Sequence, residues 1–218
     1  MKRIHPLLTA LLALALVAAA VPVGAQMNLG LSAGFVSATF TGDGVSDLDP
    51  GSVNGFSVGA WLGIPLGGRV SLAPGAYYVK KGASGDEPGT GTLTFDVGYL
   101  EIPVLLAVRL TPDDSSVGFT LFAGPEVAIE VGCDITVESG TLTATASCDD
   151  AGFDERKTLD FGALAGAGVQ FPIGERLGLV LNGGIDLGLR SLDDSTDPED
   201  IKNRAFFGSV AVVLPLGG

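Results

Sequence analysis

An alternation of apolar residues with small or polar ones, with a period of two, runs through most of this chain. From Phe56 to Leu66 every second residue is apolar and points one way, and Ser57, Gly59, Trp61 and Gly63 point the other. Successive side chains of a β-strand point to opposite faces of the sheet, so this period indicates strands that have one apolar face.

Eight segments carry the alternation, and each is long enough to cross a hydrocarbon layer as a tilted strand, which takes about 9–11 residues. They cover approximately residues 28–41, 55–66, 69–81, 92–110, 117–131, 158–172, 177–190 and 204–216. No segment after residue 25 shows a sustained helical period with capping signals. The sequence therefore predicts an all-β fold, in which residues 26–218 form an eight-stranded antiparallel up-and-down β-barrel.

The links between these segments alternate in length. The short ones are residues 67–68, 111–116 and 174–176, and the long ones are 42–54, 82–91, 132–157 and 191–203. Short turns at one end and long loops at the other are typical of barrels in the bacterial outer membrane, where the long loops face outward. We therefore expect a transmembrane barrel whose long loops lie outside the cell.

The charged residues indicate which face meets lipid. In four of the strands they share a face with glycine, whereas the opposite face is apolar throughout. A charge on the lipid face at mid-bilayer costs about 2–4 kcal/mol, so we assign the charged, glycine-rich face to the interior. The sequence predicts an interior polar network of Glu101, Arg109, Glu126, Glu130, Asp160, Asp186 and Arg190.

We expect the two arginines of this network to pair with its carboxylates. Because an eight-stranded barrel is filled by its own side chains, we interpret the network as compensation of buried charge rather than as an ion path. A small pore for ions or solutes is the alternative. A soluble lipocalin-like barrel would need the opposite arrangement, with an apolar interior and a polar exterior.

The N-terminus predicts export. Lys2 and Arg3 precede an apolar run from Leu7 to Val21, and small residues follow up to Ala25. This order is that of a secretory signal peptide, so residues 1–25 are predicted to be cleaved; the run is short for a membrane anchor, which is the other interpretation. Cleavage leaves 10 of the 12 basic residues and all 25 acidic ones, a net charge of −15.

Charge and composition exclude several functions. A strongly acidic chain lacks the basic surface that nucleic-acid binding needs. The single histidine, His5, lies in the predicted signal peptide, so the mature chain has no histidine for catalytic triads or metal ligation. We therefore predict a protein that is not an enzyme and has no cofactor, metal site or catalytic residue. Membrane-embedded lipid chemistry would need a nucleophile and base that we cannot name.

Cys133 and Cys148 both fall in the longest link, 15 residues apart. Paired cysteines in an exported chain form disulfides readily, and closing a loop of this size contributes about 3 kcal/mol. We predict an extracellular hairpin that this disulfide staples at its base. The four long links are rich in Asp and Glu, but none has the residue spacing of a calcium loop, so we interpret them as solvated acidic loops; divalent ions of the surrounding lipopolysaccharide are the alternative.

Several phrases resemble the PorT-like branch of the outer-membrane β-barrel proteins, often labelled the porin family. Residues Tyr99 to Leu106 are similar to its Tyr-Leu-Glu-Ile-Pro-Leu-Leu strand, and Asp160-Phe161-Gly162 is similar to its Asp-Phe-Gly strand. The resemblance implies an outer-membrane barrel without shared catalytic residues. We expect its partners to be outer-membrane lipid and lipopolysaccharide, the barrel-assembly machinery and an unidentified extracellular or periplasmic partner, with no nucleic acid. The expected function is surface interaction or envelope integrity through the acidic loops.

Overall fold

A computed structural model describes residues 27–45, 50–87, 91–112, 115–153, 156–174, 176–193 and 200–216. The predicted signal peptide, residues 1–25, lies outside the described residues. The strands are β1 (Met27–Thr41), β2 (Gly51–Gly67), β3 (Val70–Glu87), β4 (Gly91–Arg109), β5 (Gly118–Ser139), β6 (Leu142–Ser147), β7 (Leu159–Ile173), β8 (Leu177–Gly188) and β9 (Lys202–Leu216), with a 3-10 turn, η1 (Asp43–Val45), after β1. Among these residues no helix has the length and apolar character of a membrane span.

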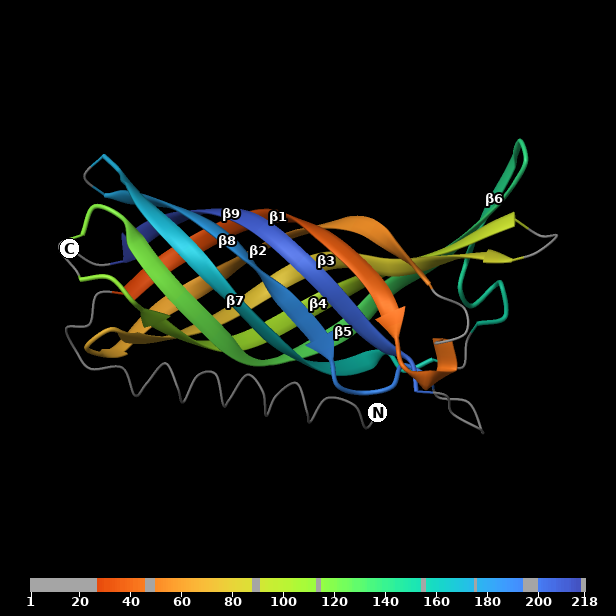
Figure 1. The fold of residues 1–218 in the computed structure, drawn as a ribbon, viewed down its shortest axis with the longest axis horizontal. Helices are drawn as coiled ribbons and strands as arrows, with labels where there is room; N and C mark the ends of the chain where they lie inside the picture. The colour runs from red at the N-terminus through yellow and green to blue at the C-terminus, as the bar shows by residue number, and fades with distance from the viewer. Residues whose placement is uncertain are drawn as a thin grey trace, which may run out of the picture.

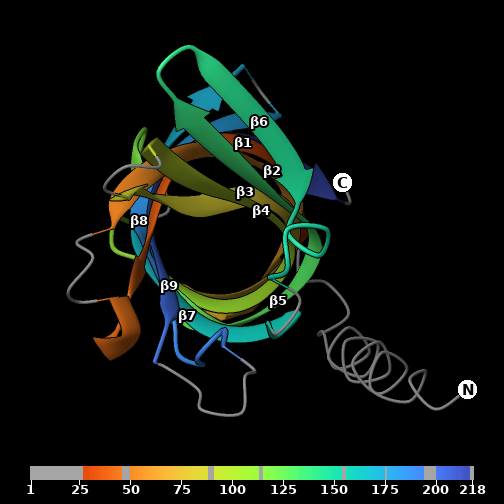
Figure 2. The same cartoon turned by 90° about the vertical axis from the view of Figure 1, so that its right-hand side faces the viewer.

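Eight of the strands close into an antiparallel ring. The hydrogen-bonded order is β4-β3-β2-β1-β9-β8-β7-β5, and β4 also pairs with β5. The first and last strands pair along their whole length, from Met27 opposite Leu216 to Thr41 opposite Lys202. Figure 1 shows the strands wrapping obliquely around the barrel, and Figure 2 shows the ring end-on. The predicted eight-stranded barrel is confirmed.

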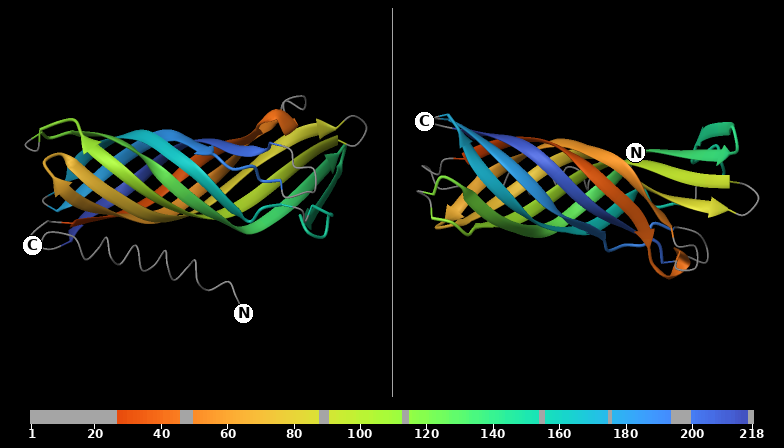
Figure 3. Two further views of the ribbon diagram at one scale, coloured as in Figure 1. Left: turned by 90° about the horizontal axis from the view of Figure 1, so that it is seen from below. Right: turned by 45° about the horizontal axis from the view of Figure 1, so that its top comes forward.

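The two ends of the barrel differ. At the short-turn end, β2 and β3 are joined by Gly68 and Arg69, and the φ angles of Gly67 and Gly68, 124° and 56°, favour glycine. The long-loop end carries η1 and the connections after β3, β6 and β8. There the sheet extends past the rim: β3 runs six residues beyond the predicted strand and β5 eight, because their pairing with β4 continues. Figure 3 shows this extension in two further views, with β6 at its outer side.

A β-bulge at Val131 changes the facing of β5. Tyr99 of β4 pairs with Glu130, whereas the preceding Gly98 pairs with Gly132, so Val131 has no partner. An extra residue shifts the alternation by one position. Before the bulge the even-numbered residues face inward, and after it Cys133 and Ile135 do so.

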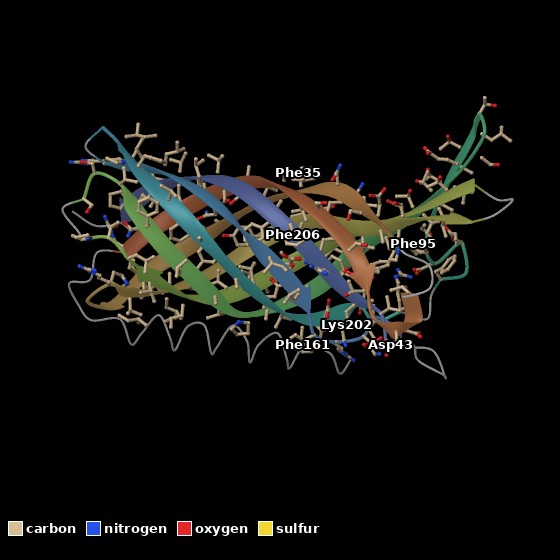
Figure 4. All side chains as sticks on the ribbon, viewed as in Figure 1. Phe35, Asp43, Phe95, Phe161, Lys202 and Phe206 are labelled. Atoms are coloured by element: carbon tan, nitrogen blue, oxygen red, sulfur yellow. A yellow bond between two sulfur atoms is a disulfide. The ribbon has the colours of Figure 1, made fainter. Side chains whose placement is uncertain are left out.

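The outer surface of the ring is apolar. Each of the eight strands presents an exposed large hydrophobic side chain: Leu31, Phe56, Tyr78, Leu106, Leu121, Phe161, Leu181 and Phe206. Figure 4 shows Phe35 and Phe161 standing away from the barrel axis on opposite outlines. Buried charged residues lie on the other face of the strands. This facing is the one that a hydrocarbon surrounding requires.

Interior glycines accommodate aromatic rings. A methyl group on Gly30 would lie 2.1 Å from the Trp61 ring, one on Gly166 2.6 Å from the Phe122 ring, and one on Gly184 2.7 Å from the Phe207 ring. No real side chain tolerates contacts this short. The glycines thus allow three large rings to lie inside a narrow ring of strands, which accounts for the glycine-rich interior face.

The facing predicts opposite outcomes for two leucine-to-arginine changes. Leu181, on the outer face of β8, is 44% exposed, and Leu142, on β6 outside the ring, is 76% exposed. Leu181→Arg places a charge against hydrocarbon and is expected to lower the free energy of unfolding by about 2–4 kcal/mol. Leu142→Arg, which meets water, should change it little. Urea titration in phospholipid vesicles measures both, and equal effects would contradict the assignment of the lipid face.

Candidate functional site: a charged plug above an interior cavity

Four charged side chains from four strands meet inside the barrel. Lys81 on β3, Glu101 on β4, Glu126 on β5 and Asp186 on β8 are each only 3–4% exposed. The Lys81 ammonium lies 2.5 Å from Glu101 Oε1 and also donates a hydrogen bond to Asp186 Oδ2. We call these four residues the plug. The barrel brings them together because all four stand on inward-facing positions of their strands.

The plug has more negative than positive groups. Oxygens of Glu101, Glu126 and Asp186 all lie within 4.8 Å of one another. Among the described residues, neither Glu126 Oε2 nor Asp186 Oδ1 has a hydrogen-bond partner, although both are buried. One ammonium therefore stands against three carboxylates, of which Glu101 and Asp186 contact it, and two carboxylate oxygens are left without a donor.

A polar chain adjoins the plug. Asn203 on β9 donates from Nδ2 to the Tyr99 hydroxyl and to Asp160 Oδ2, both at 3.2 Å. The other oxygen of Asp160 accepts the backbone N–H of Phe161 at 2.7 Å. Lys81 Nζ lies 5.8 Å from the centre of the Tyr99 ring. Unlike Glu126, Asp160 thus has a donor for each oxygen.

An apolar cluster covers the plug on the long-loop side. Its buried members, which we call the cap, are Val97, Tyr99, Ala128, Cys133, Ile135 and Cys148. The predicted disulfide between Cys133 and Cys148 is present, with the Cα atoms 5.4 Å apart, and Cys148 is fully buried. The same disulfide that joins the ends of the β5–β6 hairpin therefore also closes the barrel above the plug.

A cavity of about 330 Å³ lies on the other side of the plug. It extends from Lys81, Glu101 and Asp186 to Gly68 and Arg69 at the short-turn end. Its wall combines the Trp61, Tyr77, Phe122 and Phe207 rings with hydroxyl and amide side chains such as Ser57 and Asn182. The interior thus differs from the filled barrel expected from strand count: it is closed at the plug and hollow below it.

The structure brings together only part of the predicted interior network. Glu101, Glu126 and Asp186 form the plug, and Asp160 adjoins it. The predicted arginine pairs were wrong: in the described part of the chain, Arg109 donates to the Thr111 hydroxyl at 3.4 Å, and Arg190 donates to the Leu159 carbonyl at 3.2 Å. Both lie near the ends of their strands, beyond the level of the plug, and so do not reach its carboxylates.

Glu130 belongs to a separate ion pair. Arg156, in the loop before β7, donates from Nε and Nη2 to Glu130 Oε1 at 2.9 and 2.7 Å, and from Nη1 to Asp149 Oδ1 at 2.7 Å. The hydrogen bond to Glu130 raises the pKa of the Arg156 guanidinium above its usual value. Arg156 therefore stays cationic and ties the loop that follows the disulfide to the barrel rim.

Sequence reasoning missed Lys81, the one cation of the plug. Lys81 stands at the last position of its predicted strand, next to Lys80, and two adjacent lysines before a long link resemble a solvated strand end. One signal was present: Lys81 shares the period-two face of Tyr77 and Val79, and both of these face inward.

The neighbouring lysines provide a matched pair of variants. Lys81→Met leaves three buried carboxylates without their cation and is expected to lower the free energy of unfolding by about 3–5 kcal/mol. Lys80 pairs with Asp96 at 3.2 Å on the outer face and is 38% exposed, so Lys80→Met should cost less than about 1 kcal/mol. Urea titration in vesicles without added divalent ions measures both. A Lys81→Met effect no larger than that of Lys80→Met would show that the plug is not a buried ion-pair network.

A match to a known protein family agrees with this architecture. The family model of the outer membrane protein beta-barrel domain matches residues 22–194. No curated protein sequence matches the chain. One similar solved structure is neisserial surface protein A, with 14% identity and a TM-score of 0.46, covering 84% of this chain and 96% of that chain. A second is Ail, the attachment invasion locus protein of Yersinia pestis, with 12% identity and a TM-score of 0.42, covering 86% of this chain and 98% of that chain. A third is OprG of Pseudomonas aeruginosa, with 10% identity and a TM-score of 0.48, covering 89% of this chain and 98% of that chain. This chain belongs to the outer membrane protein beta-barrel domain family and lies in the outer membrane of a Gram-negative-type bacterium.

Proposed function

We propose that this protein is a non-enzymatic surface-interaction barrel, which anchors a β-sheet extension in the outer membrane and presents it outside the cell. The carrying observation is the β5–β6 hairpin, whose second strand pairs only with β5 among the described strands. Five of the six residues of β6, Leu142 to Ala146, are exposed. The hairpin thus offers one free strand edge beyond the barrel rim.

A free strand edge is a binding surface because its backbone N–H and C=O groups on that side lack partners. Proteins usually protect such edges with charge, proline or a covering loop. Here the edge strand reads Leu-Thr-Ala-Thr-Ala-Ser, without charge or proline. An edge of this kind accepts an extended segment of a partner through backbone hydrogen bonds.

Rigidity supports the same function. The Cys133–Cys148 disulfide closes the base of the hairpin, and inside it Thr136 and Thr145 form a hydrogen bond of 3.1 Å across the two strands. A preorganised edge loses less conformational entropy on binding than a flexible loop does. The acidic side chains around it, such as Asp134 and Glu138, give the surface a negative charge that selects against acidic partners.

Several finer assignments are proposed together with this function. Membership of the PorT-like branch, the absence of catalysis, assembly by the barrel-assembly machinery and contact with lipopolysaccharide are part of the proposal. The long-loop end faces outward, as in barrels whose chain enters from the periplasm. The mature chain without histidine supports a role in binding or envelope integrity rather than in hydrolysis.

Removal of the hairpin tests the surface function. Residues 134–147 are replaced by Gly-Gly, which removes β6 and the end of β5 but leaves both cysteines and residues 118–133 of β5 in place. Cells that display the wild-type protein are expected to be retained on protein-coated surfaces and to aggregate. Cells that display the shortened variant are expected to show neither retention nor aggregation. Heat-modifiable migration on gels should be the same for both proteins. Equal retention of both kinds of cell, with both barrels folded, would overturn the proposal.

A small pore is the second candidate function, because a cavity of about 330 Å³ lies inside the barrel. The plug and the cap lie across any continuous path. We expect planar bilayers that contain the purified wild-type protein to show no reproducible conductance. Steady single-channel steps that disappear when the protein is omitted would favour the pore instead.

A further inference from the structure

We propose that the carboxylates of the plug, Glu101, Glu126 and Asp186, form a binding site for a hard divalent cation of the Ca²⁺ or Mg²⁺ class, beside the Lys81 ammonium. This site is independent of the surface function proposed above. It rests on the geometry of the three oxygens, on the excess of negative charge and on the two buried oxygens that lack a hydrogen-bond donor.

The charge count points to a missing positive group. Lys81 supplies one positive charge against three carboxylates, all of them at most 4% exposed. Buried charges of one sign that lack compensation are strongly unfavourable in a low-dielectric interior. A divalent cation beside Lys81 would make the group of four side chains and ion electrically neutral.

The oxygen geometry fits such an ion. Hard cations take carboxylate oxygens, at about 2.0–2.1 Å for Mg²⁺ and about 2.3–2.6 Å for Ca²⁺, so two ligand oxygens of one site lie no more than about 5 Å apart. The oxygens of the three plug carboxylates meet this limit, at 4.8 Å or less. Histidine and thiolate ligands, which would select zinc or copper, are absent from this group.

The unpartnered carboxylate oxygens are the atoms that remain available to bind a cation. Asp186 uses Oδ2 for Lys81, and its Oδ1 is buried without a hydrogen-bond partner. Glu126 Oε2 is likewise buried without one. Buried carboxylate oxygens are normally satisfied, so two such atoms in one cluster indicate a ligand that these protein groups do not supply. Glu101 and Asp186 also line the cavity, which gives an ion and its water ligands a route to the site.

Metal retention by the refolded full-length mature protein tests the site directly. Protein refolded in detergent with Ca²⁺ or Mg²⁺ and then gel-filtered should retain about one ion per chain by elemental analysis. The unfolding midpoint should also rise with the concentration of added cation, because the ion binds the folded state only. Glu126→Gln should lose both effects. Glu138→Gln, which removes an exposed carboxylate from the hairpin, is the matched control and should keep both.

Lys81→Met separates cation binding from protonation of the carboxylates. Without the ammonium the site is more negative, so added Ca²⁺ or Mg²⁺ should raise the unfolding midpoint of Lys81→Met more than that of the wild type. The double variant Lys81→Met/Glu126→Gln should lose most of this gain. If lowering the pH restores Lys81→Met and the cations do not, protons compensate the plug and the proposal fails. Retention of the ion by Glu126→Gln together with its loss in Glu138→Gln would place the ion in the loops and would also overturn it.

Discussion

Closure of the sheet is the constraint on which the rest of this structure depends. A hydrocarbon layer offers no water to backbone N–H and C=O groups, so a sheet that crosses it must leave no open edge. In this chain the ladder between the first and last strands, β1 and β9, achieves closure. Eight strands make a narrow ring, and the narrow ring sets what can lie inside it.

The inside of the ring is organised by depth. The apolar cap with its disulfide lies toward the long loops, the plug lies beneath it, and the cavity occupies the remainder down to the short turns. Each layer has a different role in the narrow interior. The cap excludes water, the plug joins four strands through charge, and glycines such as Gly30 leave room for rings around the cavity.

The strands and their facing could be predicted from sequence because both depend on local alternation. Phe161 and Leu181 face lipid, and Glu101 and Asp186 face inward, as the period of two requires. The partners inside the barrel could not be predicted in the same way. Lys81 meets Asp186 across 105 residues, and such a meeting depends on the stagger of the closed ring. The alternation within one strand shows which face a residue takes, but not how far along the barrel axis it lies. For this reason the sequence prediction placed arginines near strand ends, and not Lys81, in the network.

The bulge at Val131 divides β5 into two regions that have different surroundings. Up to Glu130 the outward-facing residues must suit lipid. Beyond the bulge the inward–outward alternation is shifted by one residue, and Cys133 of the cap faces inward. The facing of the outer part of β5 is therefore set independently of the register that the membrane imposes below it. One unpaired residue thus lets the sheet beyond the rim turn a different set of side chains inward from the set that the ring requires.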